Sequence, residues 1–310
     1  SWQRLWLNWS AIMRDTFIDE LVALAAAHPH IALVVGDLGY SVIEPFADRY
    51  PERFINAGVA EQNMAGLAAG LASEGYHVFT YSIANFPTFR CAEQIRNDID
   101  YQRLAVTTVA VGGGLGYGPL GYSHHAVQDY ALMRVMPNML LATPADPQEV
   151  RACLRYLVAN PQPSYLRLGK AGEPNLHASV PVLEPGRWLT LKPAAAGTQP
   201  ALALLATGAI AADLLAWAAD PELVGASVHS LPLWGMAYKH TQVAQAAGLQ
   251  RLITVEDHLI DGGFGSWMTE ALQIMGGRMP LRSSLGLDAS VCGLVGAQAT
   301  LNAAGGLTLD

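Results

Sequence analysis

Runs of consecutive apolar residues alternate along the first half of the chain with segments in which apolar residues recur every three or four positions. A continuous apolar run is typical of a strand buried on both faces of a parallel sheet, and the longer spacing is typical of a helix. We expect helices at 16–27, within 87–99, at 130–135 and at 147–160, and strands at 31–35, 76–81, 104–111, 139–142 and 165–168. This alternation predicts an α/β fold with a doubly wound sheet.

The same alternation starts again after a stretch that is rich in Pro, Gly and Ala. Strands are expected at 201–206, 227–231 and 251–255, and helices at 211–219 and 266–275. We therefore divide the chain into an N-terminal extension (1–12), expected to be disordered, an α/β domain (13–175), a linker (176–200) and a second α/β domain (201–310) with a doubly wound or mixed sheet.

The segment 53–75 changes from a strand-like pattern to a helical one at Glu61. From there Met64, Leu67 and Leu71 fall on one helix face, while many of the remaining positions are Ala or Gly. Paired glycines inside a helix are costly, which suggests that another group approaches this helix closely. An acid at a helix start is favoured by the helix dipole, so Glu61 alone has a purely structural explanation.

Composition excludes several classes of function. The net charge of −8 and the lack of a basic cluster argue against nucleic acid or an anionic membrane as a partner. Three widely spaced cysteines support neither a disulfide framework nor a zinc site, and we expect a reducing, cytoplasmic location and no metal ligands. Only 14% of residues are charged, which large cores or contact with other subunits would both explain.

Candidate chemistry gathers where predicted strands end, the edge at which parallel sheets bind ligands. Asp37 follows the first strand, Glu61 opens a helix, and Arg167 closes a later strand. A glycine-rich loop at 112–121, which matches neither a dinucleotide fingerprint nor a P-loop, leads to His124 and His125. The aromatic pair Phe86 and Phe89 completes the set. Taken singly, each has a structural explanation, such as a strand-end salt bridge for Arg167.

Their order along one chain is more specific. The segment RFINAGVAEQNMAG at 53–66 resembles the glutamate motif of the transketolase group of thiamine-diphosphate enzymes. The resemblance continues at 79–89, 121–124, 137–146, 163–167 and 255–266, so that it covers roughly residues 14–310. It implies a pyrimidine-binding α/β domain followed by a transketolase C-terminal domain.

The resemblance also implies roles for the candidate residues. Glu61 would activate the cofactor by bonding to its aminopyrimidine, with Phe86, Phe89 and Asp37 as further cofactor-binding residues. His124 would transfer protons to and from the sugar. The substrate site would comprise Arg167, matching a position that holds the acceptor phosphate, together with His124 and His125. The implied reaction moves a two-carbon ketol unit from a ketose to an aldose.

Two departures from the family pattern matter. The motif for the metal and the diphosphate, GDG followed by NN, is missing, since the Gly-Asp-Leu at 36–38 lies before the glutamate motif without an Asn pair. The resemblance therefore implies a separate diphosphate-binding subunit that holds Mg²⁺, in an α2β2 complex. Residues 110–125 also differ, with His125 in place of the usual Gln, which puts the usual sugar substrates in doubt.

Two other interpretations stay open. One is the beta subunit of a 2-oxo-acid dehydrogenase, because residues 93–97 (EQIRN) resemble the DQIxN segment of those proteins. The other is a regulatory or scaffold relative without activity, against which the joint presence of Glu61, Phe86 and His124 argues.

Overall fold

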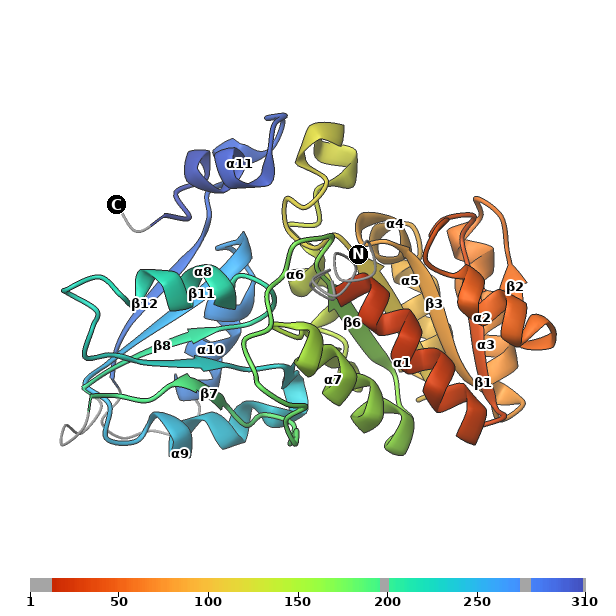
Figure 1. Ribbon diagram of the computed structural model, residues 1–310, viewed down its shortest axis with the longest axis horizontal. Coiled ribbons are helices and arrows are strands. Elements are labelled where there is room, and N and C mark those ends of the chain that lie inside the picture. Colours follow the sequence, from red (N-terminus) through yellow and green to blue (C-terminus); the bar gives the residue numbers. More distant parts are fainter. Residues whose placement is uncertain (1–12, 196–200, 274–279, 309–310) are drawn as a thin grey trace, which may run out of the picture.

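The computed structural model describes residues 13–195, 201–273 and 280–308. The predicted extension at 1–12 lies outside these residues. Two sheets form the framework (Figure 1), the first with strand order β10-β5-β6-β4-β3-β1-β2 and the second with order β12-β11-β8-β9-β7. Pairing is parallel except for β10 in the first sheet and β7 in the second. The predicted α/β fold with two doubly wound or mixed sheets is confirmed.

The strands of the first sheet are β1 (Ile31–Val35), β2 (Phe54–Asn56), β3 (His77–Ile83), β4 (Val106–Val111), β5 (Leu140–Ala142), β6 (Ser164–Leu168) and β10 (Leu233–Trp234). Those of the second are β7 (Leu189–Lys192), β8 (Leu202–Ala206), β9 (Ser227–Ser230), β11 (Arg251–Leu259) and β12 (Leu281–Leu287). The helices are α1 (Met13–Ala27), α2 (Glu44–Arg49), α3 (Glu61–Ser73), α4 (Asn85–Phe89), α5 (Ala92–Gln94), α6 (Asp129–Met133), α7 (Pro147–Ala159), α8 (Ala211–Trp217), α9 (Gln242–Ala246), α10 (Phe264–Gln273) and α11 (Gln298–Ala304).

Helices cover both faces of the first sheet, which is why strands such as β1 and β4 are buried along their whole length. On one face α1 and α7 pack together, with Phe17 and Leu154 in a shared core (Figure 1). On the other face the small residues of α3 bring its backbone close to the sheet, and Met64 and Ala68 are buried there. Gly66 and Gly70 lie on the outer side of α3, where an added Cβ would meet nothing.

The two sheets are joined by a strand from the second half of the chain that pairs in the first sheet, and by aromatic packing. The short strand β10 comes from the second half of the chain and pairs with β5 of the first sheet. Its Trp234 packs against Phe264 and Trp267 of α10. The segment predicted as a linker is only partly irregular, because residues 189–192 form β7, an antiparallel edge strand of the second sheet. A short antiparallel strand carries too few residues to show a clear period in the sequence.

Candidate active site

The segments that follow β1, β2, β3 and β4 meet at the carboxyl edge of the first sheet, as its strand order requires. Glu61 begins α3 there, and its residue is only 4% exposed. The backbone that follows β1 packs against the Glu61 side chain, since a Cβ added to Gly36 would lie 3.7 Å from Cγ of Glu61. A pocket of about 470 Å³ opens beside the carboxyl group and is lined by residues 59–63 and Arg90.

Phe86 and His124 lie together although 38 positions separate them in the sequence. Their ring centroids are 5.1 Å apart at an interplanar angle of 66°. Phe86 belongs to α4, which follows β3, and the side chain of Asn85 donates a hydrogen bond of 2.9 Å to the carbonyl of Ser123. This bond ties α4 to the loop that carries His124. Phe89, at the end of the same helix, is 47% exposed.

His124 has the protonation behaviour that a proton-transfer group needs. Burial lowers the pKa of the imidazole, and the neighbouring His125 and Arg90 lower it further. The ring is therefore mainly neutral near pH 7 and can accept a proton. The Oγ of Ser123 lies 3.0 Å from its Nδ1.

Arg90 is a member of this site that the sequence reasoning missed. Its Nη1 donates a hydrogen bond of 2.8 Å to Oε1 of Glu61. Its Cζ lies 4.2 Å from the centroid of the Phe86 ring, a cation–π contact. In the sequence, Arg90 is a single arginine that directly follows the aromatic pair. Hydrophobic periodicity alone does not distinguish such an arginine from a solvent-exposed helix residue.

Asp37 lies at the same edge, in a separate polar cluster. Its Oδ1 accepts hydrogen bonds of 2.9 Å from the hydroxyl of Tyr40 and from the side-chain amide of Asn56. These bonds lower its pKa, so the carboxyl stays ionised. The backbone at Asp37 is left-handed, with φ of 56°. Its assignment to the cofactor stays a prediction.

Arg167 is placed away from Glu61, between the two sheets. Its guanidinium donates to Oδ2 of Asp129 at 2.7 Å, to the hydroxyl of Tyr130 at 3.0 Å, to Oδ1 of Asp257, and to the carbonyls of Ala126 and Asp257. Burial opposes its charge, but Asp129 and Asp257 raise its pKa well above the ordinary value. All five N–H groups are engaged, which fits the salt-bridge interpretation. The phosphate-binding role stays a prediction.

His125 is nearly fully buried, and its Nε2 lies 3.2 Å from the carbonyl of Gly118. The ring meets Tyr122 edge-on. The side chain therefore shapes the loop that carries His124, and direct contact with a sugar stays a prediction.

Comparison with known proteins identifies the family. The sequence model of the transketolase pyrimidine binding domain matches residues 10–173. The chain belongs to the transketolase family. It is 37% identical over 165 residues to one of the subunits of apulose-4-phosphate transketolase from Phocaeicola vulgatus, and this match spans about half of each protein (53%). It is 31% identical over 263 residues to a protein of Methanocaldococcus jannaschii named as a transketolase C-terminal section, covering 84% of this chain and 81% of that one.

A solved structure described as "Split gene transketolase, inactive beta4 tetramer" has the same fold. It superposes with a TM-score of 0.82 at 32% identity, covering 97% of this chain and 95% of the other. The prediction that the chain corresponds to the C-terminal half of a transketolase is confirmed. Within the described residues, no helix is both long and apolar enough to cross a bilayer.

The transketolase family implies thiamine diphosphate, and the residues at the carboxyl edge fit its pyrimidine end. A buried carboxyl opens onto a pocket lined in part by Arg90, whose guanidinium lies over the Phe86 ring that His124 contacts. Within the described part of the chain, Oε1 of Glu61 accepts a hydrogen bond from Arg90. The surroundings therefore supply what an aminopyrimidine needs, a hydrogen-bonding carboxyl and an apolar face.

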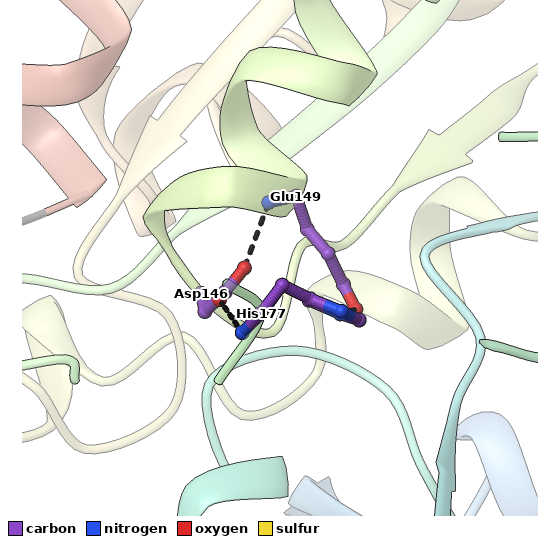
Figure 2. Close-up of side chains that lie close together, drawn as sticks. All are labelled: Asp146, Glu149 and His177. Atoms are coloured by element: carbon purple, nitrogen blue, oxygen red, sulfur yellow. Dashed lines mark hydrogen bonds and ion pairs between the residues drawn. The ribbon is translucent and has the colours of Figure 1, made fainter. Parts of the chain in front are cut away.

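A second cluster of potential ligands lies at the start of α7. Asp146, Glu149 and His177 are, among the described residues, the one group with spacing suited to a metal ion (Figure 2). Asp146 caps α7, accepting from the backbone N–H of Glu149 at 2.7 Å and from those of residues 176 and 177. Glu149 accepts from the Ala145 N–H, the Ser230 hydroxyl and His177. With these oxygens already engaged, the cluster fastens the linker to α7 and β9.

Proposed function

We propose that this chain is the pyrimidine-binding subunit of a split thiamine-diphosphate-dependent transketolase, which moves a two-carbon ketol unit from a ketose to an aldose. The observation that carries the proposal is the buried carboxyl group of Glu61 at the mouth of its pocket, linked through Arg90 to the Phe86 ring that His124 contacts. The relatives that are named as parts of transketolases support the same reaction class.

Each residue has a distinct task in this proposal. When bound, thiamine diphosphate supplies the nucleophilic carbon and the electron sink for cleavage of the ketose. Glu61 would hold the aminopyrimidine through its carboxyl group and Phe86 would supply an aromatic face for it, with Phe89 and Asp37 as further cofactor-binding residues. His124, kept neutral by burial, takes a proton from a sugar hydroxyl and returns it to the acceptor carbonyl.

The diphosphate and Mg²⁺ would be held by a second polypeptide, because this sequence lacks the GDG…NN motif. The outer side of α3 is suited to the contact, since Gly66 and Gly70 leave its backbone open. The low content of charged residues, 14%, agrees with extensive subunit contact. The related structure described as an inactive tetramer of beta chains supports the need for a partner. The assembly that we propose is α2β2.

The 2-oxo-acid dehydrogenase alternative is less well supported. It rests on the resemblance of residues 93–97, whereas the named relatives are parts of transketolases. Decarboxylation of pyruvate with transfer to a lipoyl group, rather than ketose cleavage, would favour it.

The experiment is reconstitution of the chain with a separate diphosphate-binding transketolase subunit, followed by ketol-transfer assays on a panel of phosphorylated, deoxy and sulfo ketoses. Glu61→Gln is expected to lower kcat by roughly 10²- to 10⁴-fold, the usual contribution of a proton-transferring side chain. Glu93→Gln, at an exposed acid of α5, is the matched control and should leave kcat unchanged. Full activity of Glu61→Gln would overturn the proposed role, and turnover by the isolated chain would overturn the need for a partner.

A further inference from the structure

Arg90 contacts both groups that the cofactor's pyrimidine would use. Its guanidinium donates to Oε1 of Glu61 at 2.8 Å, and its Cζ lies 4.2 Å from the centroid of the Phe86 ring. Both contacts come from one side chain, so a single movement would release the carboxyl and the aromatic face together.

The guanidinium and the aminopyrimidine compete for the same partners. Both are planar groups with N–H donors, and each would bond to the carboxyl of Glu61 while lying against an apolar ring. Arg90 also lines the pocket beside Glu61, so its present position takes up space next to the carboxyl. A pyrimidine bonded to Glu61 and stacked on Phe86 therefore requires Arg90 to move.

The side chain of Arg90 is free to move, because it is half-exposed while the side chain of Glu61 is buried. The side chain of Arg90 is 47% exposed, whereas the side chain of Glu61 is 4% exposed. Because the guanidinium end of this ion pair is open to water, solvent can replace the contacts that Arg90 gives up when it moves, including the cation–π contact, which is weak at an exposed site.

We propose that Arg90 is a latch on the cofactor site: in the free chain it holds Glu61 and covers Phe86, and it swings outward when the aminopyrimidine binds. Arg90 is thus a positioning residue that lowers the affinity of the unassembled chain for the cofactor. The inference rests on the proposed function, since it takes Glu61 as the pyrimidine-binding carboxyl.

The test measures thiamine binding to the isolated full chain by saturation-transfer NMR on the aminopyrimidine protons, with no turnover involved. Arg90→Met should bind thiamine roughly 5- to 30-fold more tightly than the wild type, because both competing contacts are gone. Arg96→Met, at another exposed arginine a few residues on, should leave the affinity unchanged. Because the expected result is a gain of binding, a loss of structure cannot imitate it.

Two further variants sharpen the result. Arg90→Lys keeps the charge but loses the planar group and should give an intermediate affinity, and it serves if Arg90→Met does not fold. Adding Glu61→Gln to Arg90→Met should abolish most of the gain. Equal, absent or weaker binding by Arg90→Met relative to wild type overturns the latch, as does a gain that persists without the Glu61 carboxyl. The proposed function is judged separately, by the activity of Glu61→Gln in the assembled enzyme.

Discussion

Removal of Arg167 tests whether the ion network between the two sheets is structural. Arg167 pairs with Asp129 of the first sheet's domain and with Asp257 of β11, and the three side chains are almost completely buried. In Arg167→Met the two carboxylates would remain buried without their cation. Loss of one partner from a buried pair typically costs about 3–5 kcal/mol, a large share of the roughly 5–15 kcal/mol that stabilises a folded chain.

The measurement is urea unfolding of the isolated chain, followed by circular dichroism and tryptophan fluorescence. Arg167→Met should lower the free energy of unfolding by about 3–5 kcal/mol. The triple variant Arg167→Met/Asp129→Asn/Asp257→Asn should recover part of this loss, because the uncompensated charges are removed. Arg187→Met, which breaks an exposed pair with Glu184, should cost less than about 1 kcal/mol. A similarly small cost for Arg167→Met would refute a structural role and favour phosphate binding.

Two other predictions concern the linker and α3. The hydrogen bond with Glu149 raises the pKa of His177, so this pair stabilises the fold below the ordinary value of 6.5 and loses that effect as the pH rises through the raised value. His177→Gln should remove about 1 kcal/mol of stability at low pH and flatten this part of the pH–stability curve in urea titrations; an unchanged curve would contradict the assignment. Gly66→Ala should raise the stability of the isolated chain by about 0.5–1 kcal/mol, because the new Cβ meets nothing, yet weaken assembly with the partner in sedimentation experiments. Undiminished assembly would show that the partner does not cover this face of α3.

The sequence by itself determined the features that depend on local pattern. Runs of mainly apolar residues predicted β1, β4 and β6, because strands buried on both faces are rich in apolar side chains. The change of period at Glu61 marked the start of α3, and the order of motifs from 53 to 167 indicated the family. These signals lie within a few neighbouring residues or in their order, so no tertiary contact is needed to read them.

Only the tertiary structure decided which residues share a site. Arg90 turns toward Glu61 because α4 packs beside the start of α3, a relation between elements that no spacing in the chain encodes. Arg167 meets Asp257, which lies 90 residues further along, because the two domains close on each other at that strand end. The packing surrounds the guanidinium of Arg167 with protein acceptors, whereas Arg90 lines an open pocket. The residue type predicts that an arginine pairs with an anionic group, and the tertiary structure determines which anionic group that is.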